Sequence, residues 1–507
     1  MGRARAPAGR RRADGTRTGR RRRPASARDL ARPGRGNPHT ATDALPRTGR
    51  RRAAAAVLAG RPDEAVELLE QGRSVLWNQA LRFRSDLSAV AAIAPELART
   101  LESVREEINT PGDSRATVDR WQLARKWDEA VRQVRQIDGF EHFGEPVPYS
   151  RLRSAATGPA VIVNVSVLGC HALVVQASAD HAEAIALDDL TAVAAAEHAD
   201  LLFAILGRRP DVVVPPEDRN PLLLKILTWL WTSTVSHVLD HPSVARALAE
   251  NPRIWWCATG SMAVLPLHAA GRYGEDGAAD VTVSARAVSS YTPTLSALLR
   301  CRAAERDFRD EPARQLAVGL PETPGMTSLP AVRRELTHLR HHFPNGRQLV
   351  GEDATREEVL VSLGSCSWVH WACHGEQDND DPAQSAFHVW DGPVTMSDLS
   401  AVSPTGVELA FLSACNTATG TTRLVDEALH LAATTQLLGY PHVVATLWSI
   451  EDFEAPGVTD GFYRRLSTTG RPRSAGAAQA LHESIEELRR SAADEPLVWA
   501  PYVHFGP

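Results

Sequence analysis

The sequence predicts an α/β fold in which helices cover both faces of a mostly parallel sheet. Two apolar runs, residues 368–375 and 407–415, are short, almost continuous and rich in Val, Phe, Trp and Leu. Strands that are buried on both faces of a parallel sheet have this composition. From Gln315 onward, further strand-like runs alternate with helical stretches. Such alternation is typical of a parallel sheet between two helical layers.

The composition is that of a globular protein whose charge is unevenly distributed. Its 507 residues suffice for about two to four domains, and 43% of them are apolar. Residues 1–52 hold 17 Arg and three Asp, a net charge of +14, which leaves −19 for the remainder of a chain whose total is −5. The acidic body argues against nucleic acid as its main partner.

Residues 1–52 are predicted to be a disordered, Arg-rich tail. Arg, Gly, Pro, Ala and Thr dominate this stretch, so it cannot build an apolar core. A basic arm that binds nucleic acid or membrane is the alternative, although the stretch has no aromatic residues to stack on bases. No apolar segment follows the arginines, so the tail does not resemble a secretory signal.

Neither the apolar runs nor the cysteines indicate a membrane or a secreted protein. The most apolar run, residues 221–231, is interrupted by Lys225 and predicts a buried helix rather than a membrane span. Six unevenly spaced cysteines do not form a disulfide framework. We therefore expect a cytoplasmic protein without a membrane partner.

Residues 53–145 are predicted to be α-helical. Within them, residues 60–69 match the second half of a tetratricopeptide repeat, with Gly60 at the turn and Ala65 in the close contact between helices. A single repeat cannot bury its apolar face alone, so we expect neighbouring segments to cover it.

Residues 150–305 are predicted to form a non-catalytic half of an α/β unit. Apolar runs separated by turns predict a strand meander, two helices and another buried strand, at 160–167, 171–175, 183–187, 190–206, 221–240 and 254–257. His268 lies in a turn-rich segment and is interpreted as a packed loop histidine.

Residues 310–507 are predicted to form the catalytic half. Besides the two central runs, strands are expected at 316–320, 348–350, 443–448 and 502–505, and helices at 330–342, 355–363, 454–467 and 474–490. Thr355 and Glu358 form a capping box, and Gly439 ends the helix that follows the second central run. Asp391 and Gly392 predict a hairpin turn.

Each central run ends in a reactive residue, His374 in the first and Cys415 in the second. If the two strands are parallel neighbours, both residues emerge at the carboxyl edge of the sheet, where open α/β sheets place their active sites. A thiol needs a base beside it to become a thiolate nucleophile, and imidazole is the usual base. The sequence therefore predicts a cysteine–histidine dyad.

Other residues around the dyad have more than one interpretation. Gly375 allows a tight turn, so that its N–H and that of Cys415 could form an oxyanion hole. Cys366, His370, Cys373 and His374 could suggest zinc, but the period of two puts Cys373 on the opposite face from the two histidines. We therefore expect no metal and no cofactor. Ser413 and Asn416 are expected to hold the loop around the nucleophile.

Three ordered motifs closely resemble the CHAT domain. They are His-Trp-Ala-Cys-His-Gly at 370–375, Leu-Ser-Ala-Cys-Asn-Thr-Ala at 412–418 and Thr-Leu-Trp-Ser-Ile-Glu-Asp at 446–452. CHAT domains are caspase-like, are related to separases and gingipains, and often follow tetratricopeptide repeats. The resemblance covers roughly residues 150–507. It implies a caspase–haemoglobinase-like three-layer sandwich and cysteine endopeptidase chemistry, with His374 and Cys415 as the dyad.

The resemblance also suggests a substrate pocket. In related peptidases, the rim formed after the strand at 443–448 contributes to the pocket for the residue before the scissile bond. Asp452 at that rim would select Arg or Lys through a charge-assisted pair. Glu451 or Glu454 could substitute for it. The alternative is that Asp452 is the N-cap of the following helix.

Two functions of different class follow. The first is a hydrolase that cleaves a protein substrate and is regulated by a protein partner at the helical region. The polar insertion at residues 376–386, with Asp378, Asp380 and Asp381, would then cover the active-site rim until the partner binds. The second is a catalytically silent CHAT scaffold that acts as a protein-interaction module. A thiol enzyme that acts on small substrates is a third, weaker alternative.

Overall fold

The computed structural model describes most of the chain from residue 41 onward. The described residues are 41–80, 90, 93–109, 126, 129–137, 147–274, 277–306, 312–376, 378, 384–402, 406–413, 430–450, 454–467 and 473–507.

An 11-stranded sheet runs through the described structure, in the order β3-β2-β1-β4-β7-β16-β15-β14-β10-β8-β9. In that order the strands are Glu183–Ala186, His171–Val175, Ala160–Asn164, Arg253–Ala258, Val288–Tyr291, Tyr502–Phe505, His442–Thr446, Leu409–Leu412, Trp368–Ala372, Gln315–Gly319 and Arg347–Val350. Seven of the ten neighbouring pairs are parallel, and the antiparallel ones are β1–β2, β2–β3 and β15–β16. The predicted meander and mostly parallel sheet are confirmed.

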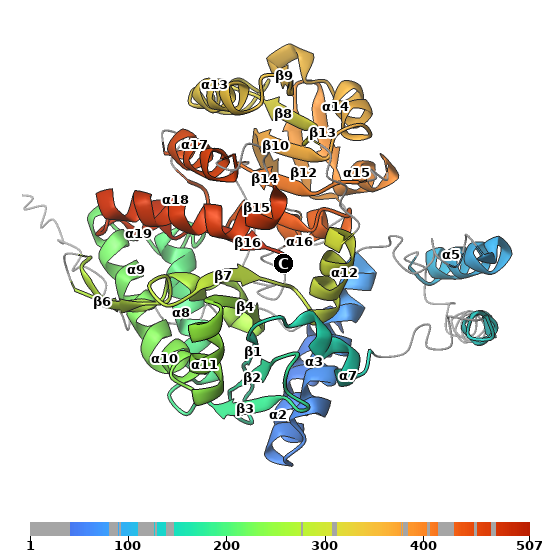
Figure 1. Ribbon diagram of the computed structural model, residues 1–507, viewed down its shortest axis with the longest axis vertical. Coiled ribbons are helices and arrows are strands. Elements are labelled where there is room, and N and C mark those ends of the chain that lie inside the picture. Colours follow the sequence, from blue (N-terminus) through green and yellow to red (C-terminus); the bar gives the residue numbers. More distant parts are fainter. Residues whose placement is uncertain are drawn as a thin grey trace, which may run out of the picture.

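Helices cover both faces of this sheet and make a three-layer arrangement (Figure 1). On the left in that view lie α8, α9, α10, α11, α13, α17, α18 and α19, which are Ala192–Ile205, Pro216–Leu230, Ser236–Leu239, Pro242–Glu250, Val332–His342, Ala455–Leu466, Ala477–Ser491 and Pro496–Trp499. On the right lie α2, α3, α7, α12, α14, α15 and α16, which are Ala41–Leu58, Pro62–Ala80, Tyr149–Leu152, Leu295–Arg306, Arg356–Leu363, Met396–Val402 and His430–Leu437. Helix α5 spans Pro95–Asn109.

The sheet has a seam where β7 meets β16. Only one residue pair, Tyr291 and Phe505, is in register there. Polar side chains reinforce it, because the Ser290 hydroxyl lies 2.8 Å from Nδ1 of His504 and Trp255 Nε1 donates to the Gly506 carbonyl at 2.8 Å. Through this seam, the strands of residues 150–305 and those of residues 310–507 form one continuous sheet.

Local signals in the sequence are confirmed where they concern a few neighbouring residues. Thr355 is the N-cap of α14, and its hydroxyl accepts from the Glu358 N–H at 3.3 Å. The hairpin around Gly392 joins β12 (Ala386–Val389) to β13 (Gly392–Thr395). Gly439 follows α16 with a φ of 109°, a conformation that favours glycine.

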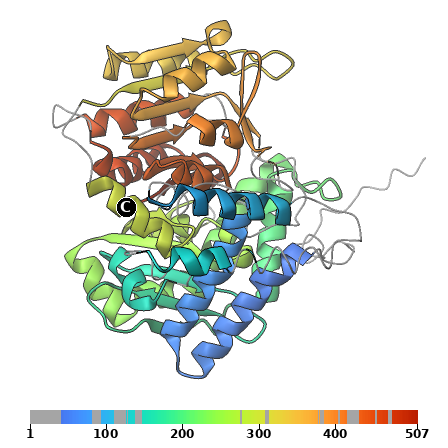
Figure 2. The same ribbon diagram turned by 90° about the vertical axis from the view of Figure 1, so that its right-hand side faces the viewer.

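Helices α2 and α3 form a hairpin that is docked on the lower half of the sheet (Figure 2). Gly60 has the expected turn conformation, with a φ of 71°, and Ala65 is fully buried. Three carboxylates on α3 accept from backbone N–H groups of the α/β body: Asp63 from Ala182, Glu67 from Tyr149 and Glu70 from Leu295, each at 2.7 Å. The similarity to a tetratricopeptide repeat stays a prediction.

One helical segment among the described residues, Pro216–Leu239, is long and apolar enough to cross a membrane by length and composition. In the fold, 61% of its most apolar window is buried inside the protein. It contains the run that predicted a buried helix, and its residues Leu223, Ile226, Leu227 and Leu230 have no solvent exposure.

Candidate active site

The two strands that end in the predicted dyad are parallel neighbours in the centre of the upper half. Trp368 of β10 is paired with Leu409 of β14, and Trp371 is paired with Leu412. In the sequence, His374 lies three residues after Trp371, and Cys415 lies three residues after Leu412. Strands β10 and β14 therefore end at the same edge of the sheet. Cys415 itself lies outside the described residues.

His374 does not belong to the strand that was expected to carry it. Strand β10 ends at Ala372, the chain bends at Cys373, and His374 begins a new strand, β11 (His374–Glu376). Strand β11 pairs with β12 in a separate three-stranded sheet with β13. The prediction of one strand over 368–375 is therefore wrong at its end. The bend matters because it lifts His374 out of the main sheet.

The His374 ring is oriented by a backbone carbonyl. Its Nε2 lies 2.7 Å from the Thr327 oxygen, and the side chain is buried. A carbonyl can only accept, so Nε2 carries the proton and donates. In the neutral ring, Nδ1 then has the lone pair, which is what a general base requires. Thr327 is a residue that the sequence pattern did not identify as functional.

Thr327 lies in the loop between β8 and α13. This loop is held by short backbone contacts, in which Leu329 N–H donates to Pro321 at 2.8 Å and Met326 N–H donates to Thr323 at 3.0 Å. Gly325 has a φ of 80°, which favours glycine at the turn. The contact between this loop and His374 links residues that are 47 positions apart in the sequence.

One face of the β11–β12 hairpin packs on the core, and the other face carries the side chain of His374. Phe387 of β12 is buried and stacks on Trp371, with ring centroids 4.2 Å apart. His388 is the register partner of His374, so both side chains are on the other face. His388 Nε2 lies 2.8 Å from Oε2 of Glu376. Stacking on Trp371 thus fixes the hairpin that carries His374.

The chain also matches a known family model. The model described as the CHAT domain covers residues 224–507, more than half of the chain. The chain belongs to the CHAT domain family. The expected α/β architecture, a mostly parallel sheet between helical layers, is the one that the structure shows.

Comparison with solved structures finds similarity at low sequence identity. This CHAT protein is similar to the Saccharomyces cerevisiae separase–securin complex, with 10% identity and a TM-score of 0.44, over 87% of this chain and 37% of that chain. It is also similar to the complex of Porphyromonas gingivalis RgpB pro- and mature domains, with 9% identity and a TM-score of 0.35, over 60% of this chain and 74% of that chain. No curated protein matches it.

The remaining predicted site residues of this CHAT protein are only partly described. Gly375 is in β11 beside His374 and is buried, and Ser413 follows β14. Asn416, Glu451 and Asp452 lie outside the described residues. Helix α17 begins at Ala455, so its N-cap position falls on Glu454, whose side chain makes no capping hydrogen bond. The proposed acidic pocket at Asp452 therefore stays a prediction.

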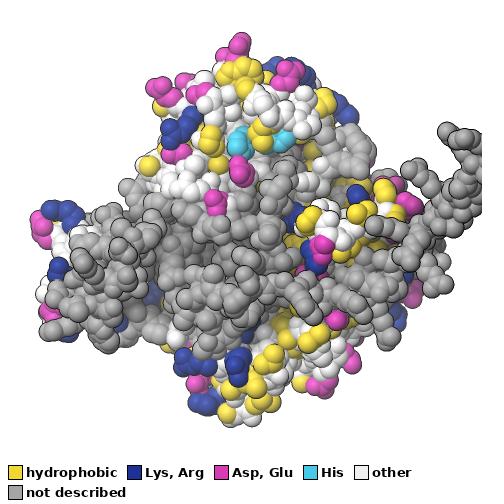
Figure 3. Space-filling view, turned by 180° about the vertical axis from the view of Figure 1, so that it is seen from behind, with side chains coloured by type: hydrophobic (Ala, Val, Ile, Leu, Met, Phe, Trp, Pro, Cys, Tyr) yellow, Lys and Arg dark blue, Asp and Glu magenta, His cyan; other side chains and the backbone are white. Residues whose placement is uncertain are grey.

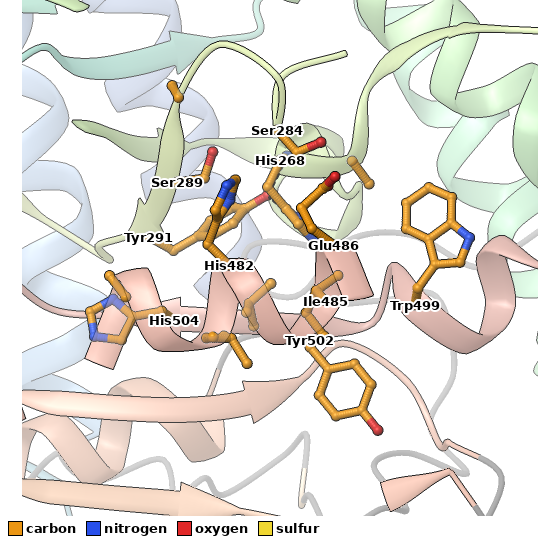
Figure 4. Close-up of a pocket in the computed structure, with 15 residues that line it drawn as sticks. His268, Ser284, Ser289, Tyr291, His482, Ile485, Glu486, Trp499, Tyr502 and His504 are labelled. Carbon is orange, nitrogen blue, oxygen red and sulfur yellow. Dashed lines mark hydrogen bonds between the residues drawn. The ribbon is translucent and has the colours of Figure 1, made fainter. Parts of the chain in front are cut away.

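A cavity of about 50 Å³ lies elsewhere in this CHAT protein, at the seam (Figure 4). Its lining includes His268, Tyr291, His482, Glu486 and Trp499. His268 is a packed histidine whose Nδ1 lies 2.9 Å from the Tyr291 hydroxyl, in agreement with its interpretation from the sequence. Burial lowers the pKa of His268 to about 4, so this ring is neutral near pH 7. The cavity shares no lining residue with the surroundings of His374.

On the face seen in Figure 3, acidic and basic side chains are interspersed over the described part of the surface.

Proposed function

We propose that this CHAT protein is a cysteine endopeptidase with His374 as general base and Cys415 as nucleophile. The observation that supports this most directly is the parallel register of β10 and β14, the strands that precede the two residues, which end at one sheet edge. The orientation of His374 by Thr327 adds to it, because a free Nδ1 lone pair is what a thiol requires of its base.

The proposed reaction follows the chemistry of a thiol nucleophile. Nδ1 of His374 takes the Cys415 proton, and the thiolate attacks the scissile carbonyl carbon. The resulting oxyanion accepts hydrogen bonds from the N–H groups of Gly375 and Cys415. His374 gives its proton to the leaving amine, and the C–N bond breaks. Water, deprotonated by His374, then hydrolyses the thioester and restores the thiol.

For substrate choice, we propose that Asp452 at the rim after β15 selects Arg or Lys before the scissile bond. A carboxylate there would form a charge-assisted pair with a basic side chain. Glu451 and Glu454 follow the same strand and could contribute.

For regulation, we propose a protein partner at the helical region, residues 53–145. Glu70 of α3 accepts from the first N–H groups of α12, and α12 meets α16 where Gln436 Nε2 lies 3.7 Å from Sγ of Cys301. Helix α16 follows the segment that contains Cys415. A partner that moves α3 would therefore change the support of that segment.

The polar insertion at residues 376–386 would cover the active-site rim until the partner binds. Deletion of residues 378–385 tests this role.

The activity is tested by cleavage of a peptide panel that contains Arg and Lys. Wild-type protein should cleave at least one member, Cys415→Ala and His374→Ala should cleave none, and Cys373→Ala should retain cleavage. Cys373 is a suitable control because it is a fully buried thiol next to His374 in the sequence. A wild-type protein that neither cleaves peptides nor reacts with a peptide electrophile would favour the alternative, a catalytically silent CHAT scaffold.

A further inference from the structure

A second histidine, His370, lies in β10, four residues before His374 in the sequence. His370 of β10 has no solvent exposure. Its Nε2 lies 3.1 Å from Oε1 of Glu335, and its Nδ1 lies 3.1 Å from the Tyr463 hydroxyl. Glu335, from the first turn of α13, is 2% exposed. A fourth residue, Thr459 of α17, donates its hydroxyl proton to the same carboxylate oxygen at 2.5 Å.

The directions of these hydrogen bonds follow from the donors that are present. Burial, and then the charge of Glu335, raise the pKa of Tyr463 well above its usual value, so the phenol keeps its proton. The Glu335 carboxylate can only accept, so His370 Nε2–H donates to it, and with a neutral ring the Tyr463 O–H donates to His370 Nδ1. Glu335 thus accepts from both His370 and Thr459. A buried carboxylate is costly unless donors surround it, so each of these donors offsets part of the cost of burying Glu335.

This network joins the two segments that also meet at His374. His370 and His374 are four residues apart on one segment, and Thr327 and Glu335 are eight residues apart on the other. The two contacts are His370–Glu335 at 3.1 Å and His374–Thr327 at 2.7 Å. The segment 327–335 is therefore attached to the β10–β11 segment at two points, one buried and one at the proposed site.

The same histidine also touches the strand that leads to Cys415. His370 is the register partner of Phe411 in β14, and their rings stack with centroids 4.9 Å apart and planes 24° apart. A shift of His370 would therefore displace both β10 and β14, the strands that lead to the proposed dyad.

We propose that Glu335 and His370 are positioning residues for the dyad: their buried contact sets the Thr327 carbonyl against His374 and so fixes the ring of the base. This inference rests on the proposed function, because it assigns a role in orienting the base of that site. It predicts that loss of the Glu335 charge leaves the fold in place but releases the His374 ring. A misplaced catalytic group commonly costs about 10- to 100-fold in rate.

The test is the rate of Cys415 alkylation by iodoacetamide in the full chain, followed by mass spectrometry of the Cys415 peptide from pH 5.5 to 9. The variants are Glu335→Gln, His374→Ala and the double variant. The matched control is Glu305→Gln, because Glu305 accepts from a buried histidine of the same sheet, His442 of β15, at 3.3 Å. Thr459→Val is a milder variant, because it removes one donor to Glu335 and leaves His370 intact.

We expect Glu335→Gln to lower the alkylation rate at pH 7 about tenfold and to move its pH profile toward that of an unassisted thiol, with a pKa of about 8.5. Glu305→Gln should leave both unchanged. In the His374→Ala background, Glu335→Gln should have no further effect, since it acts through that ring. A merely structural role would instead lower the rate in both backgrounds.

The outcomes separate this inference from the proposed function. If wild-type alkylation does not depend on His374, the proposed function fails first. If it does depend on His374, but Glu335→Gln behaves like Glu305→Gln, only the positioning role is overturned. Should Glu335→Gln fail to fold, Thr459→Val decides: a smaller loss that disappears in the His374→Ala background supports the proposal, and an unchanged rate overturns it.

Discussion

One hydrogen bond to a backbone oxygen orients the His374 ring. The Thr327 carbonyl fixes which ring nitrogen carries the proton. Other histidines are held neutral by burial instead. Desolvation lowers the pKa of His268 to about 4 and that of His504 well below its usual value, with His442 and Arg253 adding to the second shift. The protein thus contains one proposed working histidine among several buried neutral ones.

The buried histidines make stability depend on pH. In the unfolded chain a histidine takes up a proton near pH 6.5, whereas folded His268 does so only near pH 4. Since the unfolded state binds more protons between these values, stability is lost as the pH falls from about 6.5 to about 4. We expect at most about 1.4 kcal/mol per pH unit for each such histidine.

Urea unfolding at a series of pH values measures this effect. His268→Asn should reduce the acid slope by about one proton. His181→Asn should not reduce the acid slope. The hydrogen bond to Asp63 raises the pKa of exposed His181, and a raised pKa in the folded state has the opposite effect on the pH dependence of stability. An acid slope that is unaffected by His268→Asn would contradict the assignment of a buried neutral ring.

At the scale of elements, α3 is part of the α/β body rather than an independent module. Its carboxylate Glu70 is buried and accepts from the N–H groups of Leu295 and Ser296 and from the Ser296 hydroxyl. These are the first amides of α12, which have no partner within the helix. Glu70 therefore acts as a cap supplied from 225 residues away in the sequence.

Glu70→Ala should lower the free energy of unfolding by about 1–3 kcal/mol, because it leaves buried donors without an acceptor. The matched control is Glu64→Ala on the same helix, since the Glu64 side chain is 41% exposed and forms a surface ion pair with Arg61. That change should stay within about 0.5 kcal/mol. Equal effects of the two substitutions in urea unfolding would mean that the cap does not stabilise the docked helix.

The elements that could be predicted from the sequence are those with a local signal. Strands β10 and β14 are continuous apolar runs, and Thr355 caps α14 through a residue three positions away. Helix α12, helix α15 and the short hairpin of β5 (Gly271–Tyr273) and β6 (Ala279–Thr282) were not predicted, because turn-rich or polar sequence surrounds them.

The candidate site was predictable only in part for the same reason. His374 was identifiable from its motif. Thr327 and Glu335 were not, because they reach the strand from 47 and 35 residues away and have no local pattern. The break at Cys373 was also missed, since an apolar run continues across it.

At the scale of the whole molecule, the two halves share one sheet. Strand β16 comes last in the sequence but lies in the middle of the sheet, between β7 of the first half and β15 of the second. Removal of the first half would turn β16 into an edge strand and expose Phe505, which packs against Tyr291 with ring centroids 5.8 Å apart. Exposed apolar edges of this kind aggregate.

Expression of residues 310–507 alone should therefore give insoluble or unstable protein. The comparison is the full chain under the same conditions, followed by circular dichroism and thermal unfolding. A soluble fragment 310–507 that unfolds cooperatively would contradict the view that the seam is needed for folding.

The central claim is that His374 and Cys415 act together, and site-resolved labelling tests it most directly. Wild-type protein and His374→Ala are treated at pH 7 with an electrophilic peptide that ends in Arg, and the modified residue is located by mass spectrometry. The account predicts that Cys415 is the principal labelled cysteine and that its rate falls at least about 100-fold in His374→Ala. Labelling of Cys415 at the same rate in both proteins, or preferential labelling of another cysteine, would contradict it.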